Sequence, residues 1–136
     1  MKSFPALLAA FALCPILSGA DFPQILPPPP KAPLSQDQES ALASRLAGLE
    51  EAFAEVKEHD RSADAAIFLK AVRYALEFDE WYDKKAGDGV KKAATLLDEA
   101  GKRIASLEKN QTPWMAGPGW KVLGFYSKID DSPQPY

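Results

Sequence analysis

The sequence contains one cysteine and one histidine among its 136 residues. Cys14 lies inside an apolar run near the N-terminus, so removal of that run would leave a protein unable to form a disulfide. His59 has neither a second histidine nor a cysteine to join it in a zinc site. No G-x-S-x-G sequence offers it a nucleophilic serine. We therefore predict no catalytic site, no metal and no cofactor within this chain.

Basic residues are also too few for one class of partner. The chain has 16 Lys and Arg against 19 Asp and Glu, a net charge of −3. Loss of residues 1–20 would remove Lys2 and no acidic residue, which brings the net charge to −4. Nucleic-acid binding requires a basic footprint, so nucleic acid is excluded as the expected partner.

The first twenty residues have the pattern of a secretory signal. Lys2 precedes an apolar run, and Ser18-Gly19-Ala20 places small residues where a signal peptidase cuts. We predict cleavage after Ala20 and a secreted or periplasmic product. An uncleaved membrane anchor is the alternative, but the run is short and contains two prolines. Lipoprotein processing at Cys14 is disfavoured, because "FALC" lacks the usual small residues before the cysteine.

Residues 21–34, "DFPQILPPPPKAPL", are predicted to form a stiff linker. Four consecutive prolines favour polyproline II and exclude a helix. A ligand for a proline-binding module is the alternative, and a spacer is the preferred interpretation.

Residues 35–110 are predicted to form three helices. Ser35 can cap the first helix, with Gln38 at the reciprocal position of a capping box. Ser62 is predicted to cap a second helix over residues 63–83, with Asp64 favourably placed in its first turn. "AGDG" is expected to end that helix, and Asp88 to cap the third. Three apolar seams support this division; they comprise Leu42, Leu46, Leu49, Phe53 and Val56, then Ile67, Phe68, Ala71, Val72, Ala75, Leu76, Phe78 and Tyr82, then Val90, Ala93, Leu97, Ala100, Ile104 and Leu107.

Short connections make successive helices antiparallel, so the predicted fold is mainly α, an up-down-up three-helix unit. The expected core includes Leu46, Leu49, Phe68, Val72, Leu97 and Ile104. On the polar side of the second helix, Arg73–Glu77 and Glu80–Lys84 are predicted to pair one turn apart.

Residues 111–136 change character and are predicted to form a strand or hairpin. Apolar side chains alternate on both faces of residues 120–129, "DDSP" is typical of a turn, and "QPY" begins a return strand. An isolated apolar hairpin is marginal in water. We expect the helices to cover one face but to supply no ladder to its backbone, the segment to be poorly ordered alone, and a further sheet to follow Tyr136.

Two groups of residues could carry a function. "FDEWYD" gathers Asp79, Glu80 and Asp83, but on a helix these carboxylates would diverge rather than converge on an ion. Tyr74 and Trp81 are predicted to pack in the core, with docking of a neighbouring domain as the alternative. The candidate interdomain interface comprises Tyr74, Trp81, Trp114, Trp120 and Tyr126.

Two segments resemble a known family. "AIFLKAVRYALEFDEWY" and "TPWMAGPGWKVLGFYSKIDDSPQPY" resemble the N-terminal region of secreted bacterial alpha/beta hydrolases of the prolyl-oligopeptidase type. The tail follows their "RGYxSxIDGSxQPY"-like pattern at Gly124, Tyr126, Ser127, Ile129, Asp130, Ser132 and Gln134-Pro135-Tyr136. Asp131 stands where the family has a turn glycine.

The resemblance implies that this chain is a non-catalytic accessory region of an exported serine hydrolase, whose catalytic domain would follow Tyr136. The partner would be that domain, and none of the family's catalytic residues can be assigned here. The alternative is a small exported helical adaptor that binds a separate protein through the same aromatic residues.

Overall fold

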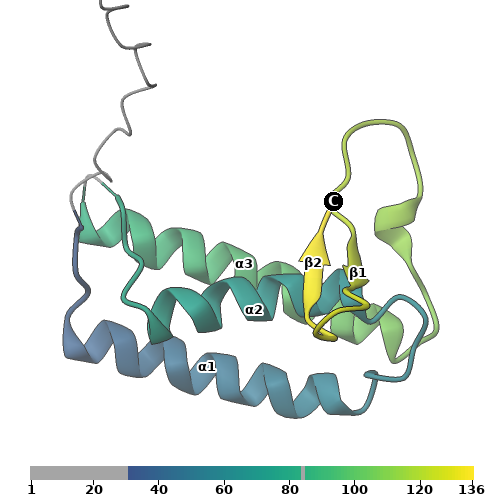
Figure 1. The fold of residues 1–136 in the computed structure, drawn as a ribbon, viewed down its shortest axis with the longest axis horizontal. Coiled ribbons are helices and arrows are strands. Elements are labelled where there is room, and N and C mark those ends of the chain that lie inside the picture. Colours follow the sequence, from purple (N-terminus) through teal and green to yellow (C-terminus); the bar gives the residue numbers. More distant parts are fainter. Residues whose placement is uncertain (1–30, 84) are drawn as a thin grey trace, which may run out of the picture.

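Three helices and a C-terminal hairpin make up the described part of the chain. The computed structural model describes residues 31–83 and 85–136 (Figure 1). The elements are α1 (Gln36–Ala54), α2 (Ala63–Glu77), α3 (Ala86–Leu107), the 3-10 helix η1 (Pro113–Met115), β1 (Gly124–Tyr126) and β2 (Pro133–Pro135). The predicted mainly α fold is confirmed. The predicted signal peptide and residues 21–30 of the predicted linker lie outside the described residues.

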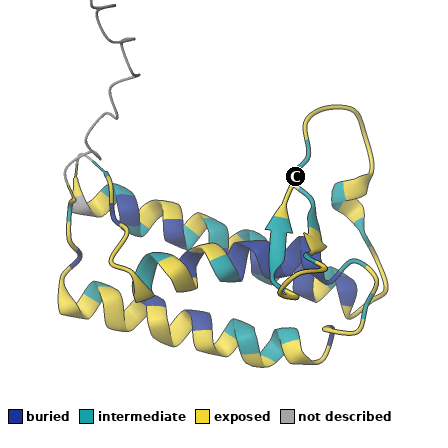
Figure 2. Cartoon of the chain, in the orientation of Figure 1, coloured by how far each residue is buried: buried dark blue, intermediate teal, exposed yellow. Residues whose placement is uncertain are grey.

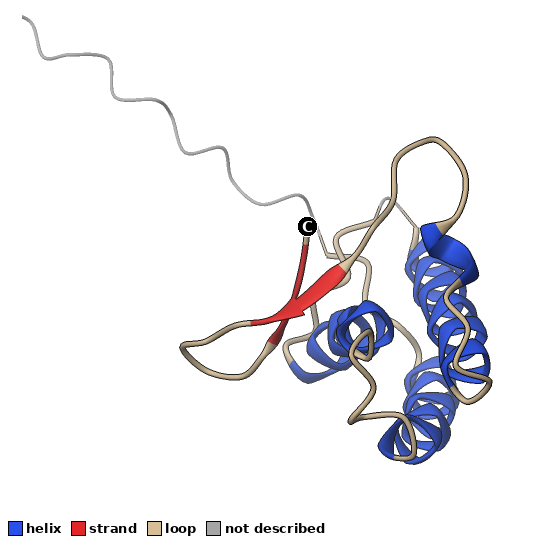
Figure 3. Cartoon of the chain, turned by 90° about the vertical axis from the view of Figure 1, so that its right-hand side faces the viewer, coloured by secondary structure: helices blue, strands red, loops and turns tan. Residues whose placement is uncertain are grey.

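The helices form a bundle in which α2 has neighbours on two sides. It contacts α1 and α3 on one side and both strands on the other, and Figure 3 shows it between the hairpin and the other two helices. This position explains its wide apolar face, which Figure 2 shows as the most continuous stretch of buried ribbon. None of the described helices combines the length and hydropathy needed to cross a bilayer.

Five of the six residues predicted in the core are buried, whereas Ala71 and Phe78, which were predicted in the apolar seam of the second helix, are exposed. Leu46, Phe68, Val72, Leu97 and Ile104 are buried, as predicted. Leu49 was also expected in the core but is only half-buried, because it packs at the edge of the α1–α3 contact, against Gly101.

The predicted start of α1 is confirmed. The Gln38 amide donates to the Ser35 side chain at 3.3 Å, and the Ser35 amide donates to the Gln38 side chain at 2.9 Å. The predicted pairing of Arg73 with Glu77 is wrong. Arg73 instead donates across the helix interface to Glu50 of α1, with two nitrogens within 2.8 Å of one carboxylate oxygen.

The second helix ends six residues earlier than predicted. Asp79 adopts a left-handed conformation (φ 51°), and the Glu80 amide donates back to the Ala75 carbonyl at 3.0 Å, which closes the helix end. Trp81 then turns into the core, where it is 4% exposed. Burial of this indole explains why the chain leaves the helix, and it leaves Tyr82, which was predicted in the apolar face, exposed.

The start of α3 also differs from the prediction. "AGDG" was expected to separate the helices with Asp88 as the cap, but α3 already begins at Ala86 and Asp88 lies in its first turn. Gly89 lies inside the helix, and packing of Trp81 explains why this position holds a glycine. A methyl group there would lie 3.1 Å from the indole. Likewise, Ser62 precedes α2 without capping it through its side chain.

The tail, residues 111–136, forms a shorter and better anchored strand pair than predicted. The strand expected over residues 120–129 is reduced to Gly124–Tyr126, paired antiparallel with Pro133–Pro135. We expected only contacts to one face from the helices, but side chains of α2 and α3 also bond backbone groups of the tail.

Candidate interaction surface

A buried carboxylate at the start of α2 holds the tail against the bundle. Asp64 is fully buried, and its Oδ1 accepts the Gly124 amide at 2.6 Å. Its Oδ2 accepts the Trp114 indole N–H at 2.9 Å and the Arg61 Nε at 2.8 Å. A buried charge must be paired and hydrogen-bonded to be tolerated. Asp64 satisfies this requirement by using the tail itself as donor.

Arg103 provides a second buried charge from α3. Its Nη1 donates to the backbone carbonyls of Asp64, at 2.9 Å, and of Val122, at 2.8 Å. Its Nε pairs with Glu99 one turn earlier at 2.9 Å. The guanidinium also lies over the rings of Phe68 and Trp114, 4.6 and 5.1 Å from their centroids. Arg103 therefore joins α3, the start of α2 and the tail.

Close backbone approach completes this anchor. Gly124 lies directly on the first turn of α2, where a methyl group would overlap the Ala63 carbonyl and come within 3.0 Å of the Asp64 amide nitrogen. Only glycine fits this approach without movement of the backbone. Further along α2, Lys70 donates to the Pro133 carbonyl at 3.1 Å and the Ser132 hydroxyl at 3.3 Å.

The outer face of the hairpin is the side directed away from α2. Side chains alternate along a strand, so Leu123, Phe125, Gln134 and Tyr136 share this outer face, opposite Gly124. Phe125 is 48% exposed and Tyr136 is 64% exposed, and their rings lie 6.0 Å apart. Other exposed large apolar residues of the tail are Met115, Trp120, Val122, Tyr126 and Ile129. The anchored hairpin thus presents an aromatic pair to solvent.

The five residues predicted to form an interface fall into different environments. Trp114 is half-buried against Asp64 and Arg103, and Trp81 lies in the core. Trp120 is fully exposed in the loop before β1. Tyr126 lies over the start of α2, where its hydroxyl is 3.3 Å from that of Ser62.

Tyr74 lies near the hairpin without belonging to it. The tyrosine is 41% exposed and packs edge-to-face on Phe78. Lys70, which bonds to β2, lies 5.2 Å from the Tyr74 ring centroid. Trp120 and Tyr74 therefore remain available to a partner, whereas Trp81 and Trp114 support the fold.

His59 has a local structural environment. Its Nδ1 accepts the Arg61 amide at 3.0 Å, so Nε2 carries the proton in the neutral ring. That Nε2 lies 3.0 Å from the Asn110 side-chain oxygen and donates to it. Both ring nitrogens are thus used to join the α1–α2 connection to the end of α3. A surface hollow of about 600 Å³ lies beside His59, lined also by Ser62, Tyr126 and Asp131.

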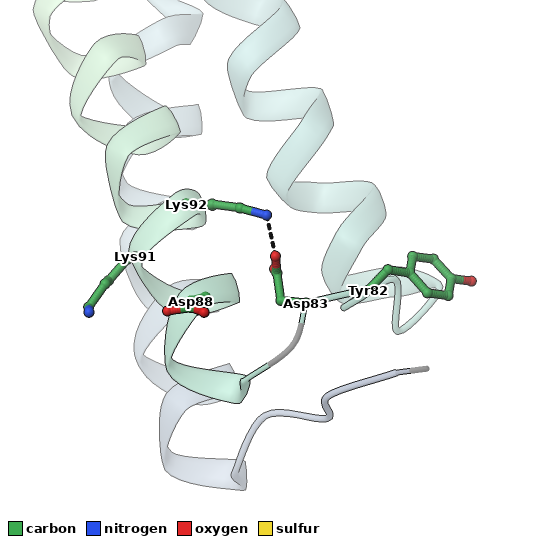
Figure 4. A pocket seen from close by; sticks show the side chains of 5 residues that line it. All are labelled: Tyr82, Asp83, Asp88, Lys91 and Lys92. Carbon is green, nitrogen blue, oxygen red and sulfur yellow. Dashed lines mark hydrogen bonds and ion pairs between the residues drawn. The ribbon is translucent and has the colours of Figure 1, made fainter. Parts of the chain in front are cut away.

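The clustered carboxylates of "FDEWYD" are not on a helix, as the prediction had them, but in the connection after α2. Asp79 pairs with Lys31 at 3.2 Å, and Asp83 pairs with Lys92. Figure 4 shows Lys92 directed at Asp83, with Lys91 and Tyr82 directed away from it. These residues line an open hollow of about 570 Å³. Within residues 31–83 and 85–136, no three metal-ligating side chains come together.

Sequence reasoning missed the residues that anchor the tail. Asp64 was seen only as a favourable first-turn charge, and Arg103 and Lys70 were not singled out as anchors. A signal was present: Asp64 interrupts the otherwise apolar run "ADAAIFL" on the most buried helix. No family model matches this chain, and no curated protein or solved structure matches it either.

Proposed function

We propose that this chain is the non-catalytic N-terminal accessory region of an exported serine hydrolase of the prolyl-oligopeptidase type. In this proposal the outer face of the hairpin docks on the catalytic domain. The observation that carries the docking role is the exposed Phe125–Tyr136 pair on a hairpin anchored to the bundle. Aromatic side chains of this kind supply much of the binding energy at protein interfaces.

Anchoring of the hairpin favours such a role. Asp64, Arg103 and Lys70 bond three backbone groups of the tail, and Lys70 also bonds the Ser132 hydroxyl. A surface held in place before binding loses less conformational entropy on association. The bundle therefore holds the outer face in a fixed position before the partner binds.

The hydrolase assignment rests on the resemblance of the tail. One structural feature is consistent with that pattern: Asp131, where the family has a turn glycine, has a φ of 52°. This is the left-handed conformation that glycine adopts at little cost. The backbone of the turn therefore retains the shape that a glycine would favour.

An exported adaptor for a separate protein is the second candidate. The anchoring of the tail favours this candidate. The tail forms backbone hydrogen bonds with the helices and within the hairpin, so these bonds need no further domain. Both candidates use the same outer face and differ in whether the partner is encoded in the same reading frame.

The gene sequence beyond the Tyr136 codon separates them. Continuation into a domain with a G-x-S-x-G sequence supports the accessory role, whereas a stop codon directly after Tyr136 in intact genomic DNA supports the adaptor. We also expect the protein purified after export to show no esterase or peptidase turnover, because the sequence predicts no activated nucleophile. Turnover that survives repurification and disappears on His59→Ala would contradict both candidates.

Binding to the separately produced catalytic domain tests the surface. Phe125→Ser should weaken this binding about tenfold or more, because it removes an aromatic anchor. Tyr82→Ser is the matched control, since Tyr82 is 41% exposed but lies in the connection after α2, away from the outer face. Equal effects of the two variants, or none from Phe125→Ser, would contradict docking through the outer face.

A further inference from the structure

The pairing of the hairpin determines which backbone groups face outward. Leu123 and Tyr136 exchange two backbone hydrogen bonds, of 3.1 and 2.9 Å, and the Ser127 amide donates to the Ser132 carbonyl at 2.9 Å. Bonded and non-bonded pairs alternate in an antiparallel ladder. The non-bonded pairs are therefore Gly124–Pro135 and Tyr126–Pro133. Their backbone groups point away from the partner strand and form the two long edges of the hairpin.

The edge of β2 has no amide donor at either outward position. Both outward residues, Pro133 and Pro135, are prolines, which have no N–H. The Pro133 carbonyl is already bonded to Lys70 at 3.1 Å. An incoming strand needs both donors and acceptors along the edge that it joins. This edge offers only the Pro135 carbonyl.

The edge of β1 is covered by the bundle. The outward Gly124 amide is bonded to Asp64 at 2.6 Å, and the Val122 carbonyl to Arg103 at 2.8 Å. Gly124 also packs face-on against the Ala63 carbonyl, which holds this end of β1 on α2. Tyr126 is the one remaining outward residue of β1, and a single residue is too short an edge for an added strand to pair with.

We infer that the hairpin is closed to strand addition along both edges, by Pro133 and Pro135 on β2 and by the Asp64 anchor on β1. A partner can then engage it only through side chains of the outer face. This inference deepens the proposed function and rests on it: the catalytic domain would present an apolar surface to Phe125 and Tyr136, not the open edge of its sheet. Proline is a recognised means of blocking an exposed edge strand.

Opening the β2 edge tests this inference without any partner. The double variant Pro133→Thr/Pro135→Thr, made in protein purified after export, restores two outward donors with residues that favour strands. Gln134→Thr is the matched control, because the Gln134 amide faces β1. Sedimentation velocity over a wide range of concentration should show a monomeric wild type, a monomeric control and a double variant whose mass rises with concentration. Amide exchange should place the new protection at positions 133 and 135.

Two results would overturn the inference. One is a double variant that stays monomeric while its Leu123 and Phe125 amides remain protected, which shows an intact hairpin. The other is a wild type that already associates with protection of the Tyr126 amide. If the double variant loses its hairpin, Pro135→Thr alone, at an exposed position, is judged by the same two criteria. A negative result for the double variant would not contradict docking through the outer face. Unchanged binding of Phe125→Ser would contradict docking but would not contradict the closed edges.

Discussion

The bundle and the tail are stabilised by different kinds of interaction. In the bundle, the core consists of aliphatic and aromatic side chains contributed by all three helices. In the tail, anchoring depends on two buried charges, Asp64 and Arg103, and on backbone groups that they bond. Apolar burial tolerates small displacements of neighbouring groups, but a buried ionic group needs its donors in place. The helical spacing of apolar residues is therefore sufficient to specify the bundle, whereas the tail depends on a few specific contacts.

This difference predicts that the two regions respond separately to substitution. Changes in the bundle core should unfold both regions, because α2 and α3 hold the anchoring charges. Changes at the anchor should release the tail and leave the bundle folded, since the helices have their own core.

The largest expected effect is in the bundle core. Leu97 is fully buried, and Leu97→Ala should lower the free energy of unfolding by about 2–5 kcal/mol. Urea unfolding followed by circular dichroism measures this loss, and amide exchange should rise in bundle and tail together. Leu49→Ala is the control: its half-buried side chain should cost clearly less. A Leu97→Ala protein with exchange raised only in the tail would contradict the comparison.

Sequence patterns predicted the bundle because its residues repeat with helical spacing. The seams through Leu46, Val72 and Leu97 and the Ser35–Gln38 cap depend on neighbours within a few turns. The end of α2 was placed too late because Phe78 and Tyr82 extend the apolar series of that helix, and Trp81 lies near the boundary of the same face. In the structure the indole reaches the core from a loop instead. Its position there depends on packing against Gly89 of α3, which is distant from local sequence patterns.

The anchor could not be predicted, because its partners are far apart in the chain. Asp64 and Gly124 are separated by 60 residues, and Arg103 and Asp64 by 39. A first-turn aspartate and a helical arginine usually face solvent. Their burial becomes visible only when the tail folds back over the start of α2. Because the tail folds back in this way, its backbone has hydrogen-bond partners that its local sequence does not reveal.

Asp64→Asn should separate the two regions. The amide keeps the shape of the carboxylate, but it removes the charge that pairs with Arg61 and turns a donor towards other donors. We expect a loss of about 1–3 kcal/mol, with faster exchange of the Gly124 amide and altered Trp114 fluorescence. Asp98→Asn, on the exposed side of α3, is the control and should leave the tail amides unchanged. Unchanged exchange at Gly124 in Asp64→Asn would show that the carboxylate does not hold the tail.

Gly124→Ala tests the close approach with a single methyl group. The methyl overlaps the Ala63 carbonyl, so the hairpin must shift away from α2 at a cost of about 1–2 kcal/mol. Gly48→Ala is the matched control, because Gly48 lies within α1 with open space around it, and it should stabilise the helix by about 0.5–1 kcal/mol. Thermal unfolding compares the two. A Gly124→Ala protein as stable as Gly48→Ala would mean that the hairpin does not rest on α2 in solution.

The smallest expected effect is confined to the turn of the hairpin and depends on pH. Hydrogen bonds from the Ser127 side chain, and then from the side chain and amide of Ser132, lower the pKa of Asp130 below its ordinary value of 3.8. A carboxyl group whose pKa falls on folding stabilises the folded turn when it is ionised. This contribution is complete above its ordinary pKa and is lost as the pH falls through the lowered value.

A pH titration followed by NMR should therefore show the Ser132 amide resonance moving only in strong acid, with the bundle resonances unaffected at that step. Asp130→Asn should abolish this step, whereas Asp131→Asn, the adjacent exposed residue, should retain it. Because Asp130 is exposed, neither variant should release Gly124 from Asp64. A step at or above the ordinary pKa would show that the serine hydrogen bonds are absent in solution, and a simultaneous loss of Gly124 protection would show that the turn and the anchor act as one unit.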